Sequence, residues 1–325
     1  MILLSFGLYS FTVAPMVTPS ANGGELTAAG HCLGIAHPTG YPLWSVLSHC
    51  FQSIVPFGSM AYRSNLLSAV IGALSVLLIG LTFFRLTKNS SLLIMVAALV
   101  SLEPYFWRET LASEVYVLHI FLTALFTWLI SSHFKSHGNQ FAMAACFTLG
   151  LSLSNHLLTV LNLPLLLILF IPKSGRSQLT LKTISNRILV FLMGASIYLY
   201  LPIRSLYQPQ LSWGSPHTFS SFIRHITGAQ FHGHLNEGLN TSVETSFGLV
   251  REFSGKPFYW TLFLCGAIGF ALLLMKCRST LVRLSLVGFI SGLVLVPSLY
   301  KIHDIGSYFV PLIVSSYLGI VYLLH

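Results

Sequence analysis

Apolar segments long enough to cross a membrane recur along the whole chain, separated by polar segments that are mostly short. Each has about 15 to 22 residues, and at about 1.5 Å per residue such a helix crosses a hydrocarbon core of about 30 Å. The pattern predicts an all-α integral membrane protein with about ten transmembrane helices, forming a single polytopic membrane domain over residues 1–325. The predicted spans are residues 2–17, 65–84, 91–106, 113–133, 140–154, 157–172, 188–203, 258–275, 284–300 and 306–323.

Two long polar segments interrupt this pattern, residues 18–64 and 204–257. Long loops in a compact protein are usually functional, and we expect these two to carry short interfacial helices. The apolar stretch Tyr41–Phe57 is too short for a span and is interrupted by His49 and Gln52. We expect it to form a helix that lies at the membrane interface.

The basic residues predict the orientation of the spans. Residues 2–17 lack the charged start and the cleavage site of a secretory signal, so we expect them to remain as a first span with a cytosolic N-terminus. Alternation then places both termini and four basic loops in the cytosol, as the positive-inside rule requires. These loops contain ten of the 17 Lys and Arg residues, namely Arg85, Lys88, Lys135, Lys173, Arg176, Lys182, Arg187, Lys276, Arg278 and Arg283.

The acidic residues were not used for this orientation, yet all of them fall on the opposite side. Acidic residues contribute little to orientation, so their segregation indicates a functional outer face. We therefore predict an exoplasmic active site in a bacterial inner membrane or an equivalent membrane. The acidic residues are Glu25, Glu103, Glu109, Glu114, Glu237, Glu244, Glu252 and Asp304.

Composition agrees with a membrane protein. Hydrophobic residues make up 54% of the chain and charged residues 8%, whereas about a quarter of the residues in soluble domains are charged. The formal charge of +9 does not indicate a nucleic-acid partner, because the basic residues are scattered in ones and twos. Cys32 and Cys50 share a loop and could form a disulfide in an oxidising compartment, but the cysteines are expected to be free.

The first long loop contains the strongest candidate for chemistry. Glu25 comes just after the first predicted span, and His37 follows in a segment rich in Gly and Pro, which fix the backbone path. An enzyme acting on a membrane-borne, phosphate-containing substrate needs such a base for the acceptor and such a donor for the phosphate. The structural alternative is an interfacial glutamate and a histidine that caps a turn.

Other polar residues gather at the outer ends of the predicted spans. Glu114 opens the span 113–133, where the helix dipole alone also favours an acid, and Glu103 and Glu109 are expected to be solvated or paired with Arg108. Asn155-His156 interrupts an apolar run, either to break the helix or to bind substrate.

Further candidates follow the predicted span 188–203. Arg204 can bind a lipid phosphate, in a substrate or in a headgroup. Trp213 suits an interfacial anchor or a platform for a sugar ring. The histidines 225, 232 and 234 are not spaced with an acid or a Cys as in a closed metal site, so we predict no metal ligands.

Taken together, these segments resemble the transmembrane protein 260 family, which comprises a eukaryotic protein O-mannosyltransferase and bacterial relatives within the C-type glycosyltransferase superfamily. The motif of the first loop is the most specific part of the resemblance. The motifs are Gly24-Glu25-Leu26, Leu33-Gly34-Ile35-Ala36-His37-Pro38, Gly40-Tyr41-Pro42-Leu43, Asn65-Leu66-Leu67-Ser68-Ala69, Ser113-Glu114-Val115-Tyr116, Asn155-His156, Tyr200-Leu201-Pro202-Ile203-Arg204, Trp213-Gly214-Ser215-Pro216, and Asp304-Ile305 with Tyr308-Phe309 and Pro311.

The resemblance implies a C-type glycosyltransferase-like fold and transfer of mannose or a similar hexose, with inversion, from a polyprenyl-phosphate donor. The acceptor is expected on the exoplasmic side, as a protein Ser or Thr hydroxyl or a cell-envelope glycan. Glu25 becomes the candidate base or acceptor-orienting group, Glu114 the second acid, and His37 and Arg204 the phosphate contacts. The implied substrate-binding residues are Asn22, His37, Tyr41, Asn155, His156, Arg204, Trp213 and Asp304; no cofactor is assigned, although a divalent metal remains open.

The chain departs from the family at Asn22, where relatives usually carry Asp three residues before the glutamate of the motif. An amide cannot take up a proton, so either Glu25 carries that role, or another group does, or the protein is weakened or inactive. The chain also ends directly after its last predicted span, so we expect no counterpart of the soluble extension found in some relatives.

Two other classes of function compete with a glycosyltransferase. A transporter or flippase of a lipid-linked substrate should carry polar groups at mid-span and broken helices in related halves, whereas here the ionisable groups gather at one face. A catalytically weakened membrane scaffold is favoured by Asn22 alone. The sequence therefore predicts a transferase whose partners are membrane lipid, a polyprenyl-phosphate sugar and a protein or glycan acceptor.

Overall fold

The protein is all-helical throughout the part of the chain that the structure describes, which confirms the predicted class. A computed structural model describes residues 2–18, 22–134, 139–170, 180–233, 248–300, 302 and 304–324. Within these ranges the only β-type pairing is an isolated bridge between Ile35 and Ser212.

Among the described residues, six helices are long and apolar enough to cross a membrane, so the predicted number of ten spans is not confirmed. A seventh span results if α5 (Ser90–Ser101) and α6 (Pro104–Leu111), which are bent by 65° to each other, are counted as one. The six are α4 (Met60–Thr87), α7 (Val115–His133), the continuous helix Leu181–Leu206 formed by α10, η3 and α11, α16 (Pro257–Lys276), α17 (Thr280–Leu299), and η5 with α18 (Ile305–Leu323).

The remaining predicted spans are shortened or broken for local reasons. The first covers only α1 (Ile2–Thr12), whose 11 residues reach about 17 Å at the rise of an α-helix. The third is broken at Pro104, because proline favours the start of a new helix and disfavours helical backbone just before it. The apolar segments Gln140–Leu153 (α8) and Leu157–Phe170 are also shorter than a full span.

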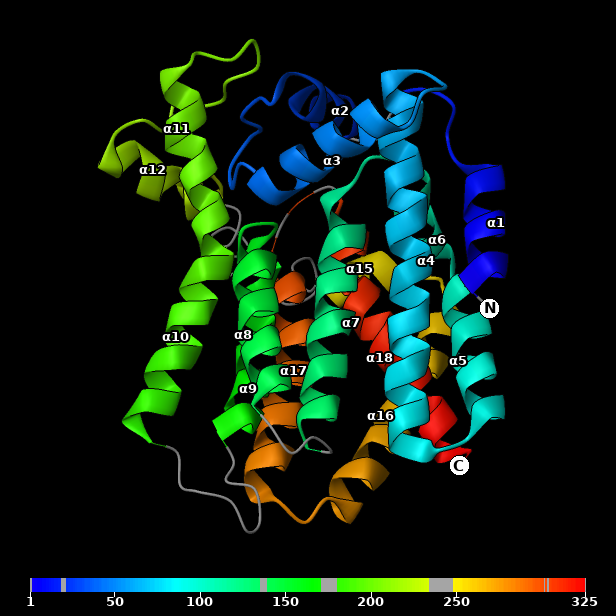
Figure 1. Ribbon diagram of the computed structural model, residues 1–325. Coiled ribbons are helices and arrows are strands. Elements are labelled where there is room, and N and C mark those ends of the chain that lie inside the picture. The colour runs from blue at the N-terminus through cyan, green and yellow to red at the C-terminus, as the bar shows by residue number, and fades with distance from the viewer. Residues whose placement is uncertain are drawn as a thin grey trace.

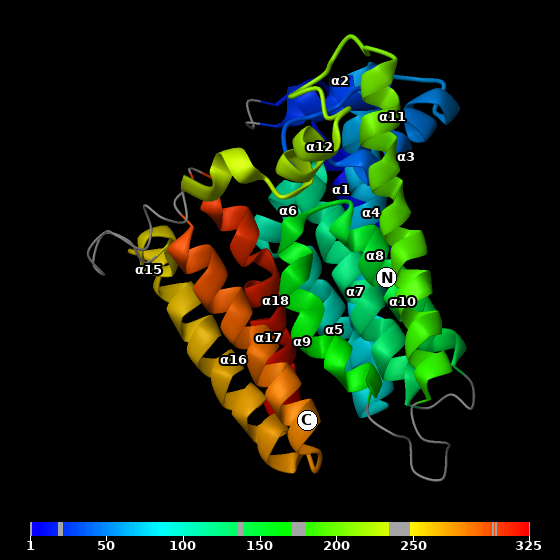
Figure 2. The same ribbon diagram turned by 90° about the vertical axis from the view of Figure 1, so that its left-hand side faces the viewer.

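The long helices run side by side, and three short helices lie at one end of them (Figure 1). These are α2 (Gly23–Cys32), α3 (Pro42–Ile54) and α12 (Phe219–Ile226). The helix predicted in the apolar stretch of the first long loop is therefore present as α3, and it crosses the ends of the long helices. In the view turned by 90°, α16, α17 and α18 form one group beside the group that contains α4, α7, α8 and α10 (Figure 2).

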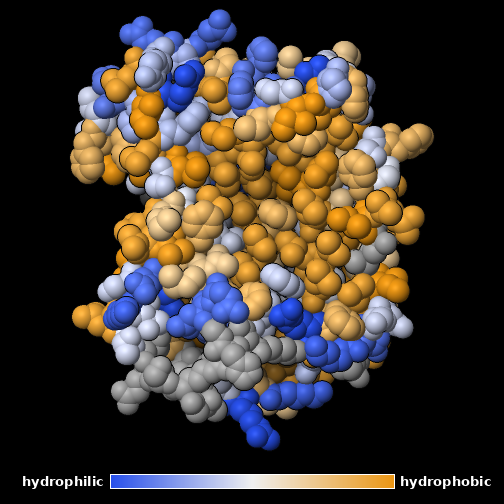
Figure 3. All heavy atoms as spheres, in the orientation of Figure 1, coloured by the Kyte–Doolittle hydropathy of each residue, from blue (hydrophilic) through white to orange (hydrophobic). Residues whose placement is uncertain are grey.

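The described acidic residues are confined to one end of the molecule. The described acidic residues lie in α2, around α6, at the start of α7, in α15 (Gly248–Phe253) and directly before η5, in the half of the molecule that carries the short helices (Figure 1). We call this the acidic end. At the other end, Arg85 and Lys88 close α4, Lys182 starts α10, and Lys276 ends α16. Between the ends lies a band of mostly hydrophobic side chains (Figure 3), as expected for a membrane-spanning bundle.

Pairs of glycines let the long helices approach closely. A Cβ atom on Gly269 of α16 would collide with the backbone of Gly319 in α18, and one on Gly150 of α8 would collide with the Phe191 carbonyl in α10. Small residues at such crossings are typical of helices packed in a membrane. Away from these contacts, Cys32 and Cys50 are both free, so they form no disulfide with each other.

Candidate functional site

The backbone of the first long loop folds back so that His37 meets Glu25. Helix α2 has Glu25 in its first turn and ends at Leu33, which adopts the left-handed conformation with φ 49°. A tight turn then reverses the chain at Gly40, whose φ is 87° and where a Cβ atom would lie 2.7 Å from Leu201. Only glycine fits this combination of positive φ and close approach without strain.

Glu25 and His37 form the centre of the site. The backbone N–H of His37 donates to Oε1 of Glu25 at 2.6 Å, and Nδ1 of the ring lies 2.8 Å from Oε2. Nε2 of His37 lies 3.0 Å from the hydroxyl of Tyr41. Burial raises the pKa of Glu25, but the hydrogen bonds and charge of His37 outweigh this effect and hold the pKa below its usual value. Glu25 is thus kept ionised while 20% of its side chain stays exposed.

Glu114 lies buried beside this pair, at the start of α7. Its neighbour Ser113 donates its N–H and hydroxyl to the side-chain oxygen of Asn65, at 2.8 and 2.9 Å, and contacts Thr27 of α2 at 3.2 Å. Burial first, then Tyr308 and the charges of Glu25 and Glu114, raise the pKa of Tyr41. The negative charges of both predicted catalytic carboxylates therefore raise the pKa of the same tyrosine.

Aromatic rings form the inner wall of the site. The ring of His156 stacks on Tyr41 with centroids 6.0 Å apart, and it contacts Tyr116 and Tyr308 at 5.3 and 5.6 Å. Asn155 anchors this segment by donating to the carbonyl of Val115 at 3.0 Å. Burial lowers the pKa of His156 to about 3, so this imidazole is neutral at physiological pH.

The second long loop closes the site from outside. The N–H of Ile35 donates to the carbonyl of Leu211 at 2.8 Å, and the N–H of Trp213 donates to the carbonyl of Ile35 at 3.0 Å. These two backbone hydrogen bonds join the first long loop to the second. This pairing sets the ring of Trp213 against that of His37, with centroids 6.1 Å apart. On α12, Nε2 of His225 lies 3.2 Å from the carbonyl of Ala36.

Arg204 and Asn22 lie at the two ends of α2. Nε and Nη2 of Arg204 donate to the carbonyls of Leu33 and Cys32, at 2.9 and 3.3 Å. These carbonyls are about 10 Å along the helix from Glu25. Asn22 is the N-cap of α2, but its side chain makes no capping hydrogen bond. The two hydrogen bonds of Arg204 thus fix the end of α2. Its predicted contact with a phosphate stays a prediction.

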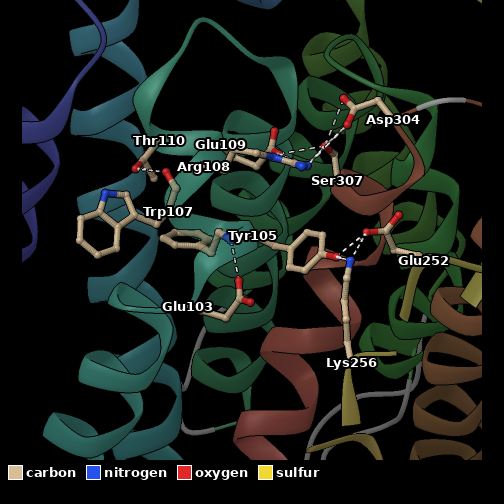
Figure 4. A network of polar contacts seen from close by, with 11 residues as sticks. Glu103, Tyr105, Trp107, Arg108, Glu109, Thr110, Glu252, Lys256, Asp304 and Ser307 are labelled. Atoms are coloured by element: carbon tan, nitrogen blue, oxygen red, sulfur yellow. Dashed lines mark hydrogen bonds and ion pairs between the residues drawn. The ribbon is translucent and has the colours of Figure 1, made fainter. Parts of the chain in front are cut away.

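A second polar cluster lies nearby at the acidic end (Figure 4). Arg108 binds Glu109 at 3.0 Å and Asp304 at 3.5 Å, and the hydroxyl of Ser307 donates to Glu109 at 2.8 Å. We call these four residues the Arg108 cluster. It joins α6 to η5, and it is where the structure places Asp304, which was predicted to bind substrate.

Two further acids are satisfied by partners far away in the sequence. Glu103 accepts the N–H of Phe106 at 2.6 Å and the hydroxyl of Tyr259 at 2.9 Å. Glu252 binds Tyr105 and Lys256 (Figure 4). Glu103 is only 1% exposed and is held by Phe106 and Tyr259, so the expectation that it is solvated or paired with Arg108 is wrong. Pairing with Arg108 is confirmed for Glu109.

The predicted residues therefore fall into one main group and several outliers. The structure brings together Glu25, His37, Tyr41, His156 and Trp213, with Glu114 behind them. Tyr116 and Tyr308 line the same site and were not among the candidates, although both stand in motifs that carry the family resemblance. Of the three histidines weighed as metal ligands, His225 and His232 lie against backbone carbonyls, and His234 is outside the described residues.

Fold and site together define a polytopic helical membrane protein with a carboxylate and histidine pair at one end of its bundle. The family model described as the protein O-mannosyl-transferase TMEM260 N-terminal domain matches residues 22–179, which include Glu25, His37, Glu114 and His156. Over these residues the chain belongs to the TMEM260 family.

Two relatives show how far the similarity extends. The protein O-mannosyl-transferase TMEM260 of Mus musculus is 32% identical over 218 residues, which are 65% of this chain and 31% of the mouse protein. The protein O-mannosyl-transferase tmem260 of Dictyostelium discoideum is 29% identical over 243 residues, covering 69% of this chain and 29% of that protein. The chain thus spans about a third of the length of these curated relatives.

Proposed function

We propose that the protein is a membrane mannosyltransferase that moves mannose, or a similar hexose, from a polyprenyl-phosphate donor to an exoplasmic hydroxyl. The names of the two relatives, both protein O-mannosyl-transferases, support the transferase class. The lipid-linked donor and the acceptor, a protein Ser or Thr hydroxyl or a cell-envelope glycan, follow from the family resemblance. Both remain part of the proposal.

The observation that carries the proposal is the pair formed by Glu25 and His37. An acceptor hydroxyl must lose its proton as it attacks the anomeric carbon, so the site needs a carboxylate that is ionised near neutral pH and open to substrate. Glu25 meets both conditions, because His37 lowers its pKa and part of its side chain is exposed. Glu114 supplies a second carboxylate held against α2 through Ser113.

In the proposed reaction, the acceptor oxygen forms a bond to the anomeric carbon while the bond to the lipid phosphate breaks on the opposite face. The configuration inverts, the proton of the acceptor passes to Glu25, and the phosphate leaves with the bonding electrons. No covalent link between sugar and protein is needed. The negative charge that develops on the phosphate needs a cation or a set of N–H donors nearby.

The contacts of His37 favour a positioning role over the phosphate contact that the sequence suggested. Its backbone N–H and Nδ1 both face Glu25, and Nε2 faces Tyr41. Donation to a phosphate would therefore require one of these hydrogen bonds to break. We assign His37 to orienting Glu25 and keeping it ionised.

The decisive experiment is turnover of the purified protein in lipid nanodiscs with polyprenyl-phosphate mannose and a peptide acceptor rich in Ser and Thr. Glu25→Gln is expected to lower the release of polyprenyl phosphate by about 100-fold or more, as expected for loss of a general base. Glu252→Gln is the matched control, since Glu252 lies at the same end but binds Tyr105 and Lys256. Undiminished release by Glu25→Gln would remove Glu25 from the mechanism.

Two native cysteines test the proposed sidedness without any substitution near Glu25. Cys50 is exposed on α3 at the acidic end, and Cys277 follows α16 at the opposite end. The positive-inside rule orients the acidic end away from the cytosol, so a membrane-impermeant maleimide added to intact cells should label Cys50 and spare Cys277. Labelling of Cys277 alone would place the active site on the cytosolic face and refute this part of the proposal.

A further inference from the structure

A cavity of about 340 Å³ lies beside the candidate site, between the turn that carries His37 and helix α12. This volume is within the usual range for small-molecule sites. Pro38 belongs to that turn, and Trp213 and Gln230 come from the second long loop. Helix α12 contributes Ser220, Arg224 and His225.

Helix α12 separates its residues by chemistry onto three faces. Ser220, Ser221, Arg224 and His225 recur at helical spacing and line the cavity. Phe222 and Ile226 pack against the small core around Tyr198 and Leu201. Phe219 and Ile223, four residues apart, are large apolar side chains left exposed next to the cavity. The helix thus presents a polar wall and an apolar edge side by side.

The lining suits a ligand that carries both an anion and a sugar ring. Arg224 is the cation of the lining, and its guanidinium makes no hydrogen bond or ion pair with any residue that the structure describes. No acidic residue is among the described lining residues. Trp213 is partly exposed and offers a flat apolar ring, while its N–H donates to Oε1 of Gln230 at 3.4 Å. The amide N–H groups of Gln230 and the hydroxyl of Ser220 remain to bind hydroxyls of a sugar.

The cavity also adjoins the reacting groups. Trp213 lines the cavity and contacts the ring of His37, whose partner is Glu25. Pro38 is the next residue after His37, and His225 lies against the carbonyl of Ala36. A sugar stacked on Trp213 would therefore be separated from Glu25 by about the width of one side chain, that of His37. Transfer to a neighbouring hydroxyl requires the sugar and the base to be this close.

We propose that this cavity binds the hexose phosphate head group of the lipid donor. Trp213 stacks on the sugar, Arg224 binds the phosphate, and the exposed edge formed by Phe219 and Ile223 contacts the first isoprene units of the lipid. The inference rests on the proposed function and gives the departing phosphate the cation that Arg204 does not supply in its present contacts.

The test measures binding and needs no turnover. Mannose 1-phosphate, mannose and inorganic phosphate are titrated onto the full chain in nanodiscs by ligand-observed NMR. Arg224→Gln is expected to weaken mannose 1-phosphate by about tenfold or more, as for a lost charge-assisted hydrogen bond, and to leave mannose unchanged. Trp213→Ala should weaken mannose and mannose 1-phosphate together and leave inorganic phosphate unchanged.

Arg251→Gln is the matched control, because Arg251 is another exposed arginine at the acidic end, bonded only to the carbonyl of Ile302 among the described residues. Equal affinity of Arg224→Gln and the unaltered chain for mannose 1-phosphate, or no saturable binding by the unaltered chain, would overturn the proposal. If inorganic phosphate binds as tightly as mannose 1-phosphate, the proposal that Trp213 binds the sugar is overturned. If Glu25→Gln keeps full turnover while binding still depends on Arg224, the proposed base is wrong and the head-group site stands.

Discussion

The two carboxylate clusters at the acidic end differ in what satisfies their acids. Glu25 is held by the imidazole and the backbone N–H of a single residue, His37. Glu109 is held by the guanidinium of Arg108 and by a hydroxyl, in a cluster that joins two helical segments far apart in the sequence. An imidazole can exchange a proton, whereas a guanidinium keeps its charge at any physiological pH. The first arrangement suits proton transfer and the second suits structural support.

The largest expected effect is on catalysis, when His37 is replaced. His37→Ala removes the ring that hydrogen bonds to Glu25 and lowers its pKa, and we expect kcat to fall by about 100-fold. Because the pKa of Glu25 lies below its usual value, the unaltered enzyme should lose activity only as the pH falls through that lowered pKa. In the variant the pKa rises, so the acid limb of the profile of kcat/KM against pH should move to higher pH.

His217→Ala serves as the control for this experiment. His217 is exposed on the second long loop, and within the described residues its side chain makes no hydrogen bond or ion pair with either cluster. Its replacement should leave both kcat and the acid limb in place. An unchanged acid limb in His37→Ala would show that His37 does not set the pKa of Glu25, and the contrast between the clusters would fail.

A smaller effect, on stability, is expected from the Arg108 cluster. Arg108→Gln leaves the buried Glu109 without its cation, a change that costs about 3–5 kcal/mol for fully buried pairs. Since the Arg108 side chain is 53% exposed, water replaces part of the interaction and we expect about 1–3 kcal/mol. The measurement is thermal unfolding in detergent, with kcat of the folded fraction changing little.

The double variant Arg108→Gln with Glu109→Gln sharpens this prediction. It removes the uncompensated charge together with the cation, so it should unfold at a higher temperature than Arg108→Gln alone. If Arg108→Gln unfolds at the temperature of the unaltered chain and instead lowers kcat by a large factor, the Arg108 cluster is part of the catalytic machinery. The division of labour between the two clusters would then be wrong.

The features that the sequence predicted well are those set by local pattern. Apolar periodicity was sufficient for the all-α class and for α3, and the distribution of charge predicted that acids and clustered bases lie at opposite ends. The number of spans was not predictable in this way, because hydropathy counts apolar residues and ignores breaks in the backbone. Pro104 and the cap formed by Glu103 divide one apolar segment into two helices bent by 65°.

Long-range partners explain the errors at the site. The burial of Glu103 depends on Tyr259, and that of Glu109 on Ser307, which are more than 150 residues further along the chain. Arg204 binds carbonyls at the end of α2, and the sequence does not reveal which backbone groups a fold leaves open. Glu25 and His37 were predictable as one site because a single loop of known motif carries both.

The smallest expected effect concerns Asn22, the departure from the family. Asn and Asp are about equally good N-caps, and the Asn22 side chain makes no capping bond, so Asn22→Asp should change the free energy of unfolding by less than about 0.5 kcal/mol. An added negative charge one turn from Glu25 is favoured by the helix dipole and opposed by like-charge repulsion, and these effects are of similar size.

If Glu25 with His37 already supplies the base, Asn22→Asp should change kcat by only a small factor in the nanodisc assay. Asn22→Ala is the matched control, since it removes the amide without adding a carboxylate. If kcat rises by about 100-fold in Asn22→Asp and not in Asn22→Ala, the increase is as large as the contribution of a general base. It would mean that position 22 is where this fold needs its carboxylate, that Glu25 orients the acceptor, and that the chain as it stands is a weakened member of its family.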